Sequence, residues 1–567
     1  MHSSTEPRTG PTNGQPAPTN VAELVGRTLA RLGAGHAFGV VGSGNFSVTN
    51  ALRRHGVPFT AARHEGGAAT MADAYGRMSG RVGIVTTHQG CGLTNAVTGI
   101  GEAAKSRTPM IVLTADSAAA AVRSNFRIDQ DGLARSVGAV AERVHSPASA
   151  VADTVRAYRT AVNERRTVVL SLPIDVQAAP VPAEAGTGVV RLPAPRPVRP
   201  AEESVDALAD LIRAAERPVF VAGRGGRCAG PEIAALAEAS GALVATSAVA
   251  HGLFAGDPFS LGISGGFSSP YSAAAIAGAD LIVGFGCALN MWTMRHGALI
   301  GPAAKVAQVD VEDAGLGANR PIDLGVLGDS ARTAAAVHAR LRAAGHRRTG
   351  LRTGETRAAI AARSRWNSED TPDLSTALSI DPRVLSRELD RLLPAERIVS
   401  IDSGNFMGYP SAYLSVPDEF GFCFTQAFQS IGLGLHTAIG AATARPDRLP
   451  VLGVGDGGFL MAISELETAV RERIPLVVIV YNDSAYGAEV HHFDADETDL
   501  EVVRFPPVDL AAIARGYGAA GLTVRRVGDL AGVTTWLAGP REAPLVIDAR
   551  IASDGGAWWL AEAFRGH

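Results

Sequence analysis

Residues 453–483 read GVGDGGFLMAISELETAVRERIPLVVIVYND and contain the clearest structural pattern of the sequence. An apolar strand pattern ends in Gly455-Asp456-Gly457-Gly458, a helical pattern follows, and the strand IPLVVIV ends at Asn482-Asp483. A strand, a helix and a second strand in this order predict parallel strands joined by a crossover helix. Both acidic side chains would then lie at carboxyl ends of strands, which is the edge where open α/β sheets bind their ligands.

The same alternation of short apolar runs and Ala-rich helical stretches extends from about residue 21 to the C terminus. It predicts an α/β protein with three doubly wound domains and mainly parallel sheets. Two breaks divide it, because residues 181–200 are rich in proline and residues 346–381 are polar and weakly periodic. We therefore expect domains over residues 21–185, 200–345 and 379–567, preceded by a disordered tail over residues 1–20.

Composition excludes several classes of protein. The 567 residues carry a net charge of −4 and contain no basic run, which argues against a nucleic-acid surface. No apolar run approaches the roughly 20 residues needed to span a bilayer, and the N terminus lacks a signal-peptide pattern. The four cysteines are far apart and lack metal-ligand spacing. These features predict a cytoplasmic protein.

The glycines around Asp456 suggest a particular ligand. Glycine lets backbone amides approach a diphosphate closely, and carboxylate oxygens at two neighbouring strand ends suit a hard cation such as Mg²⁺. An ordinary strand–turn–helix with solvated carboxylates is the alternative interpretation. The spacing between Asp456 and Asn482-Asp483 favours a site for a metal and a diphosphate.

At this point the chain resembles the thiamine diphosphate-dependent 2-oxo acid decarboxylases and the acetohydroxyacid (acetolactate) synthases. Their fingerprint is Gly-Asp-Gly, an intervening stretch of this length, and Asn-Asn. The resemblance implies that Asp456, Asp483 and the main chain of Ala485 bind Mg²⁺, while Gly455, Gly457 and Gly458 contact the cofactor. Asp483 departs from the usual Asn, and its extra charge should tighten Mg²⁺ binding but repel the phosphates.

A second motif, RHEGGAA at residues 63–69, resembles the family segment whose glutamate contacts the aminopyrimidine ring of the cofactor. A carboxyl group at N1′ favours the imino tautomer, whose 4′-nitrogen can take the C2 proton, so Glu65 would activate the cofactor. A glutamate that merely interacts with a helix dipole is the alternative. In the family this glutamate and the metal site belong to different subunits, which implies a homodimer or a homotetramer.

Two loops of the N-terminal domain resemble benzoylformate decarboxylase. Ser43 follows the pattern Phe-Gly-Val-Val-Gly, and His88 stands where that enzyme has a histidine. The Gly-x-Gly-x-x-Asn pattern of the family recurs after His88 and ends at Asn95. Gln130 instead resembles an active-site glutamine of acetohydroxyacid synthases. A structural role for His88 is the alternative interpretation.

The C-terminal domain contains further matches. Residues 426–440 resemble the segment that supports the bent cofactor, with the Gln429 carbonyl accepting from the 4′-amino group and Ile431 between the rings. Glu489 lies where pyruvate decarboxylase has its catalytic glutamate, and a raised pKa would let it supply a proton. A solvated helix glutamate is the alternative interpretation. His491 and His492 belong either to the substrate pocket or to a helix surface.

The resemblance implies non-oxidative decarboxylation of a 2-oxo acid, carboligation to an aldehyde or 2-oxo acid acceptor, or both. Ser43, His88 and Glu489 favour the decarboxylase, and Gln130 favours the synthase. An FAD-containing oxidase or dehydrogenase and a non-catalytic cofactor-binding paralogue are the alternatives. The middle-domain loop AGRGGRCAG (222–230) is not a dinucleotide fingerprint, so FAD is possible but not favoured.

Overall fold

The computed structural model describes residues 19–181, 192–193, 196–494 and 499–560. Most of the predicted tail, residues 1–18, lies outside the described residues. Asn20, at its end, instead caps the first helix by accepting from the main chain of Glu23 at 3.0 Å. None of the described helices is both long and apolar enough to cross a membrane.

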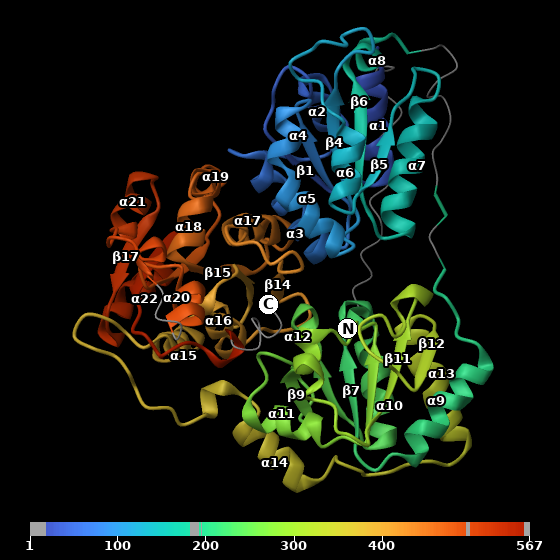
Figure 1. The fold of residues 1–567 in the computed structure, drawn as a ribbon, viewed down its shortest axis with the longest axis vertical. Coiled ribbons are helices and arrows are strands. Elements are labelled where there is room, and N and C mark those ends of the chain that lie inside the picture. Colours follow the sequence, from blue (N-terminus) through green and yellow to red (C-terminus); the bar gives the residue numbers. More distant parts are fainter. Residues whose placement is uncertain (1–18, 182–191, 194–195, 495–498, 561–567) are drawn as a thin grey trace. The chain divides into compact units, whose positions relative to one another are not determined.

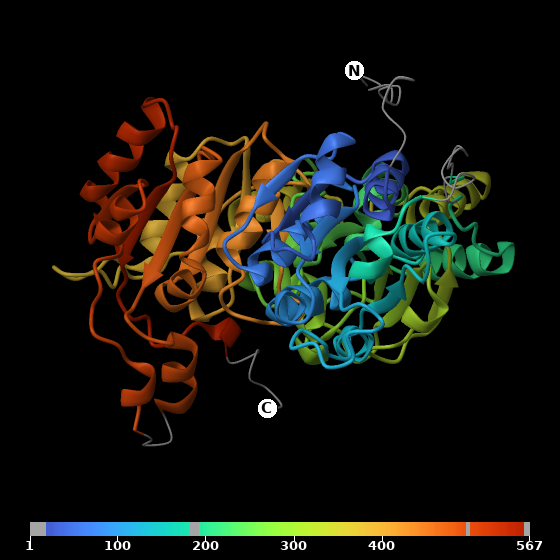
Figure 2. The same cartoon turned by 90° about the horizontal axis from the view of Figure 1, so that it is seen from above.

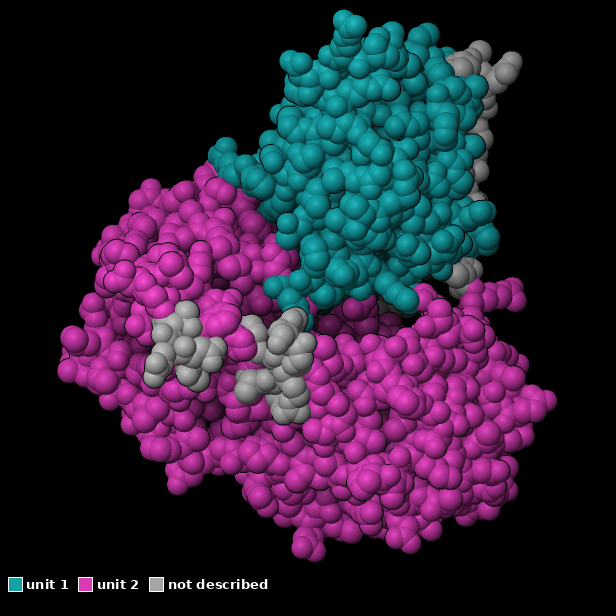
Figure 3. Space-filling view, in the orientation of Figure 1, with its two compact units in different colours: residues 1–194, 427–429 teal, residues 195–426, 430–567 magenta. Residues whose placement is uncertain are grey.

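The chain divides into two compact units (Figure 3). The first contains Met1–Ala194 together with a short piece of the C-terminal half, Ala427–Gln429, and the second contains the rest. Each unit is built from parallel sheets covered by helices.

The first unit holds one six-stranded sheet (Figure 1). Its strands, all parallel, lie in the order β2-β1-β3-β4-β6-β5. The strands are β1 (His36–Gly39), β2 (Phe59–Ala61), β3 (Gly83–Thr87), β4 (Met110–Asp116), β5 (Val140–Arg143) and β6 (Thr167–Pro173). The helices are α1 (Val21–Leu32), α2 (Phe46–Arg54), α3 (Glu65–Ser79), α4 (Cys91–Asn95), α5 (Val97–Lys105), α6 (Gln130–Ser136), α7 (Ala150–Asn163) and α8 (Ile174–Ala178).

The second unit begins with a sheet in the order β12-β11-β10-β7-β8-β9. Its strands are β7 (Pro218–Ala222), β8 (Leu243–Thr246), β9 (Ser260–Ile263), β10 (Leu281–Phe285), β11 (Lys305–Asp310) and β12 (Leu324–Leu327). Its helices are α9 (Glu202–Ala214), α10 (Gly230–Ser240), α11 (Pro270–Ala277), α12 (Met291–Met294), α13 (Ser330–Ala343) and α14 (Gly354–Arg363). Helix α14 lies in the predicted polar break, and its Ile360 packs into this core.

Alternation along β7 shows why the sheet needs helices on both faces. Phe220 and Ala222 belong to a core shared with α9, α10 and α13, whereas Val219 and Val221 belong to another core shared with α11. Successive side chains of a strand point to opposite faces, so a strand that is apolar throughout must be covered twice.

The second unit also contains the third sheet, in the order β14-β13-β15-β16-β18-β17, whose strands Figure 2 shows flanked by helices. Its strands are β13 (Arg397–Ile401), β14 (Phe422–Phe424), β15 (Leu449–Gly455), β16 (Val477–Asn482), β17 (Ala520–Val524) and β18 (Leu545–Arg550). Its helices are α15 (Pro382–Leu392), α16 (Gly408–Tyr413), α17 (Gly434–Ala444), α18 (Asp456–Ala462), α19 (Glu465–Arg471), α20 (Gly487–Phe493), α21 (Leu510–Gly516) and α22 (Ala531–Ala538). The predicted α/β class with three mainly parallel sheets is confirmed.

Candidate active site

Glu65 lies at the first position of α3, the helix that follows β2, and its side chain is buried. The preceding residue, His64, caps the helix by accepting from the main chain of Gly66 at 3.1 Å. The Oε2 atom of Glu65 accepts from the side-chain amide of Asn95 at 3.0 Å. Asn95 therefore orients the carboxylate, and a carboxylate at a helix N terminus is favoured by the helix dipole.

Ser43 and His88 follow two neighbouring strands of the sheet, β1 and β3. Their side chains lie 3.4 Å apart, from Ser43 Oγ to His88 Nε2. His88 Nδ1 lies 3.0 Å from the carbonyl of Gln89, which can only accept, so Nδ1 carries a proton. Nε2 faces the Ser43 hydroxyl, and the edge-on ring of Phe126, 4.7 Å away between centroids, packs against His88.

Gly92 shows that Glu65 and His88 belong to one site. A β-carbon at this position would lie 3.2 Å from Glu65 Oε1 and 3.2 Å from His88 Cβ. Gln130 is buried beneath the loop that contains Gly90 and Gly92. Its side-chain amide accepts from Gly90 N at 3.0 Å and donates to the Ala115 carbonyl at 3.1 Å. The side chain of Gln130 thus fixes the backbone of the loop.

Asp456 and Asp483 follow the neighbouring strands β15 and β16 in the second unit. Their carboxyl groups hydrogen bond to each other, and Asp483 Oδ1 also accepts from Ala485 N at 3.2 Å. Burial and then the charge of Asp483 raise the pKa of Asp456 to about 7, and desolvation also raises the pKa of Asp483, although that residue is exposed. Two carboxyl groups this close repel each other when both are ionised, and a shared proton or a bound cation would relieve that repulsion.

This donor set fits Mg²⁺. Two carboxylates and a nearby main-chain carbonyl supply hard oxygen ligands, and a divalent cation would relieve their mutual repulsion. In the described part of the chain no cluster of three or more His, Cys, Asp or Glu side chains could hold a metal. A cation at Asp456 therefore needs further oxygen ligands from the main chain, from water or from a bound phosphate.

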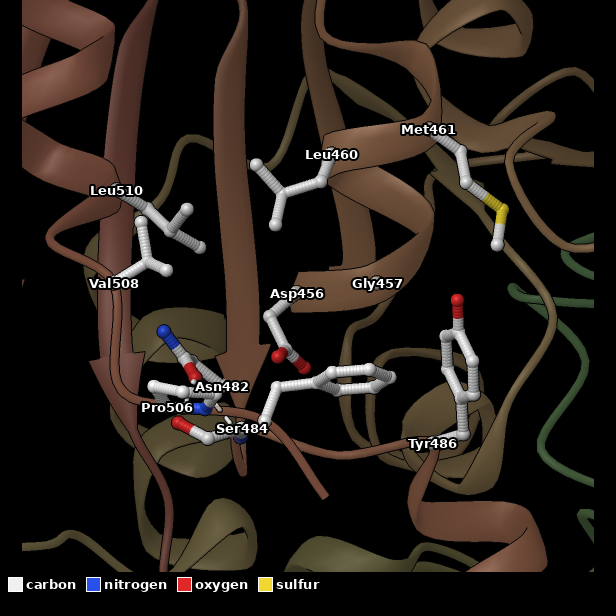
Figure 4. A pocket seen from close by; sticks show the side chains of 11 residues that line it. Asp456, Gly457, Leu460, Met461, Asn482, Ser484, Tyr486, Pro506, Val508 and Leu510 are labelled. Carbon is white, nitrogen blue, oxygen red and sulfur yellow. Dashed lines mark hydrogen bonds between the residues drawn. The ribbon is translucent and has the colours of Figure 1, made fainter. Parts of the chain in front are cut away.

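The glycines after Asp456 are required by packing. A β-carbon at Gly457 would lie 2.7 Å from the ring of Tyr486, and one at Gly458 would lie 2.4 Å from Asp402 Oδ2. Beside them is a cavity of about 310 Å³ with apolar walls that include Leu460 and Val508. Figure 4 shows the carboxylate of Asp456 between the side chains of Asn482 and Tyr486 at this cavity.

A third carboxylate, Asp402, directly follows β13 and holds the loop that precedes α17. It is fully buried and accepts from the main chain of Ser403 at 2.7 Å and of Gly432 at 2.9 Å. Burial raises its pKa to about 6, although backbone N–H groups act in the opposite direction. In this loop Gln429 has a left-handed backbone with φ of 59°, and Ile431 is 38% exposed.

Helix α20 carries Glu489, His491 and His492, and all three side chains are half-buried. His491 packs beside Gly556 and acts electrostatically on Asp483, whereas His492 packs against the ring of Phe493. Near the C terminus, Trp559 is a core residue that donates to the Asn405 carbonyl at 2.8 Å.

The structure thus brings Ser43, Glu65 and His88 together in the first unit, and Asp456 and Asp483 together in the second. The sequence interpretation assigned no role to Asn95 or Asp402, which orient Glu65 and the Ile431 loop. Asp402 directly follows the apolar strand RIVSI, so the rule that identified Asp456 could also have identified it.

Comparison with known proteins agrees with this geometry. Residues 19–135, 205–337 and 402–549 match, in that order, the N-terminal TPP binding domain, the central domain and the C-terminal TPP binding domain of the thiamine pyrophosphate enzymes. The chain is 31% identical to a probable 2-ketoarginine decarboxylase of Pseudomonas aeruginosa over 532 residues, covering 91% of each chain.

Two other relatives extend the range of reactions. A sulfoacetaldehyde acetyltransferase of Castellaniella defragrans is 29% identical, with 90% of this chain and 89% of that protein covered. A putative acetolactate synthase large subunit of Mycobacterium tuberculosis is 30% identical, with 88% and 92% covered. Among solved structures, the chain resembles the thiamine diphosphate-dependent 4-hydroxybenzoylformate decarboxylase of Rhodococcus jostii RHA1, with a TM-score of 0.80 and 20% sequence identity. The match covers 94% of this chain and 100% of that chain, which shows that the two have the same fold. The chain belongs to the thiamine pyrophosphate enzyme family.

Proposed function

We propose that this protein is a thiamine diphosphate- and Mg²⁺-dependent enzyme that breaks or forms the carbon–carbon bond next to a 2-oxo group. The reaction is the non-oxidative decarboxylation of a 2-oxo acid, with release of an aldehyde or carboligation to an aldehyde or 2-oxo acid acceptor. The observation that carries this proposal is the Ser43–His88 pair beside the buried Glu65. The decarboxylases and transferases among its relatives support it.

The cofactor would be held mainly by the second unit. Asp456, Asp483 and the main-chain carbonyl of Ala485 would bind Mg²⁺, and the Gly455–Gly458 turn would face the diphosphate. When bound, thiamine diphosphate would supply a carbanion for addition to the 2-oxo carbon and an electron sink for the pair left by CO₂. Glu65 would exchange a proton with the pyrimidine N1′, and the Gln429 carbonyl would accept from the 4′-amino group.

The substrate would meet the first unit. The Ser43 hydroxyl and the His88 ring offer hydrogen-bonding groups beside Glu65, which suits a substrate carboxylate and the proton that must move as CO₂ leaves. Gln130 shapes this loop from behind. Glu489, on α20, would supply the proton that completes aldehyde release.

The first test is CO₂ release from a panel of aliphatic, aromatic and basic 2-oxo acids, with and without aldehyde acceptors. We expect at least one acid to release CO₂, and His88→Ala to lower that rate by about 10²-fold, the lower range for loss of a proton-transfer group. His145→Ala, which removes an exposed histidine of the same unit, should leave the rate unchanged. Absence of CO₂ from every acid despite demonstrated cofactor binding contradicts the proposal.

Product analysis in the same assay separates the two fates. An aldehyde as the sole product indicates a decarboxylase, and a 2-hydroxy ketone or acyl product indicates a carboligase. A purified protein that is yellow and oxidises its substrate would instead favour the flavin-dependent alternative.

The active enzyme would be a homodimer or a homotetramer, in which Glu65 and Asp456 of different subunits serve one cofactor. Large apolar side chains flank both candidate sites and are exposed in the single chain, namely Phe46 (59%), Phe126 (43%) and Met461 (51%). Exposed apolar groups of this size at a functional site suit burial by a second copy.

A subunit-mixing experiment tests this arrangement. Glu65→Gln and Asp456→Asn proteins should each be inactive, but hybrids formed by subunit exchange would contain one intact site. With random exchange about a quarter of the wild-type sites are restored. If mixing restores no activity although hybrid dimers form, both residues must act within one chain.

The proposed place of action is the cytoplasm. All four cysteines lie in the described part of the chain and no disulfide joins them, which suits a reducing compartment.

A further inference from the structure

Three residues from the C-terminal half, Ala427–Gln429, pack on the first unit and are held there by Glu102 of α5. Glu102 Oε1 accepts from the main chain of Ala427 at 3.1 Å, and Oε2 accepts from that of Phe428 at 2.6 Å. Glu102 is fully buried. One carboxylate thus satisfies two consecutive N–H groups of a segment more than three hundred residues away in the sequence.

Glu102 is itself fixed by a buried ionic cluster. Arg77 of α3 donates to Glu102 Oε1 at 2.7 Å and to Asp73 at 2.6 Å, and the Ser106 hydroxyl donates to Glu102 Oε1 at 3.1 Å. Burial acts to raise the pKa of Glu102, but the Arg77 charge and the two backbone N–H groups outweigh it, so the pKa is lowered. The carboxylate therefore stays ionised and keeps four donors around it.

The side chain of Phe428 adds a contact on the same helix. A β-carbon at Gly101 would lie 2.8 Å from Phe428 Cε1, so only glycine leaves room for the ring there. The ammonium group of Lys105 lies 5.2 Å from the centroid of the same ring, within cation–π range. The segment is thus held by its backbone and by its side chain.

This segment leads directly into the residues expected to touch the cofactor. Gln429 has a left-handed backbone, which is unfavourable for a residue with a β-carbon, and it carries the carbonyl assigned to the 4′-amino group. On the far side of the loop, Asp402 accepts from Gly432 N at 2.9 Å. The loop that bears Gln429 and Ile431 is therefore fixed at both ends by buried carboxylates.

We propose that Glu102, held by Arg77, is a positioning residue that fixes Ala427–Gln429 so that the Gln429 carbonyl and Ile431 face the aminopyrimidine–thiazolium part of the cofactor. The inference rests on the proposed use of thiamine diphosphate but not on the identity of the 2-oxo acid. It assigns the pyrimidine-binding domain a second task beside that of Glu65, since its α5 shapes the cofactor loop of its own chain.

Glu102→Gln tests the proposal. Glutamine has one side-chain acceptor oxygen, so it can satisfy only one of the Ala427 and Phe428 N–H groups at a time. Its NH₂ group would then face the second N–H group or Arg77, which are also donors. We expect the dissociation constant of thiamine diphosphate, measured with saturating Mg²⁺ by quenching of intrinsic fluorescence, to rise about tenfold. At saturating cofactor, the near-UV circular dichroism of the bound cofactor should change and exchange of its C2 proton should slow. Glu142→Gln, which breaks an Arg–Glu pair of the same unit away from the loop, is the matched control and should change neither.

A second variant covers the case in which Glu102→Gln does not fold. Gly101→Ala keeps the ionic cluster and improves helix propensity, but its methyl group displaces the Phe428 ring, so it should reproduce the spectral change. In the Glu102→Gln background, Gln429→Gly should recover part of the lost affinity, because glycine adopts the left-handed backbone without a β-carbon penalty.

Wild-type dichroism and C2 exchange in folded Glu102→Gln or Gly101→Ala protein at saturating cofactor overturn the inference, even if the variants unfold at a lower temperature. The proposed function fails separately, when the wild-type protein binds and activates the cofactor yet turns over no 2-oxo acid. If the wild-type protein binds no thiamine diphosphate, both proposals fall.

Discussion

Replacing Glu65 with glutamine is expected to lower the rate of 2-oxo acid turnover by about 10²- to 10⁴-fold, the range measured for removal of a group that transfers a proton. The amide has almost the shape of the carboxyl group and can still bond to Asn95, so the fold and the cofactor affinity should change little. What is lost is a group that can exchange a proton with the pyrimidine nitrogen. The direct measurement is the rate of C2 proton exchange of bound thiamine diphosphate, followed by NMR after quenching.

Two outcomes separate this role from a structural one. Asn95→Ala removes the donor that orients Glu65 but leaves the carboxyl group, so its effect should be in the same direction and smaller. If Glu65→Gln exchanges the C2 proton at the wild-type rate, Glu65 does not activate the cofactor. A parallel fall in melting temperature and activity would assign it to stability instead.

Asp456→Asn is expected to abolish the stabilisation that Mg²⁺ and thiamine diphosphate give to the folded protein. Loss of the negative charge of a direct ligand should weaken cofactor binding by at least about 100-fold, since even residues behind the ligands are worth 10- to 100-fold. The measurement is the shift in melting temperature on adding both compounds, which depends on ligand affinity.

Without metal, the same substitution should stabilise the protein. Burial and Asp483 raise the pKa of Asp456 to about 7, so the folded state resists ionisation of a group that ionises freely when unfolded. This cost is complete above the folded pKa and shrinks progressively as the pH falls from about 7 towards the ordinary pKa of about 4, because over that range only the folded protein holds the extra proton. At about pH 8 the metal-free Asp456→Asn protein should therefore melt at a higher temperature than the wild type.

Asp483→Asn is the matched variant. It restores the residue usual in the family, where an asparagine at this position still serves as a ligand, so Mg²⁺ binding should weaken less than in Asp456→Asn. Equal losses of the Mg²⁺-dependent melting shift in both variants would show that the two carboxylate charges contribute equally to affinity. Retention of the full shift in Asp456→Asn would place the metal elsewhere.

Much of the fold and the identity of the family could be predicted from the sequence, because both depend on local patterns. A strand that is apolar on both faces must be covered by helices, and polar residues that follow such strands gather at one edge of a sheet. Asp456, Asp483, Glu65 and His88 all follow strands, and the structure groups them in pairs as this rule predicts.

The remaining features depend on contacts that no local pattern records. Glu102 reads as an ordinary helix glutamate, and nothing in VTGIGEAAK shows that it meets the main chain of Ala427 and Phe428. Gln130 resembled a residue that faces substrate, yet its amide is engaged by the loop at Gly90 and by β4. The direction of a buried polar side chain is decided by its three-dimensional partners, which a single sequence does not reveal.

The separation of the candidate residues into two sheets has a consequence for how such enzymes diversify. The ends of β15 and β16 carry groups suited to the cofactor, which is the same throughout the family. The loops after β1 and β3 carry Ser43 and His88, which would contact the part of the substrate that varies between enzymes. Substitutions can therefore accumulate in the two loops after β1 and β3 without changing the residues at the ends of β15 and β16 that would bind the cofactor. Exchanging those two loops between family members should transfer the substrate preference of the donor enzyme to the recipient.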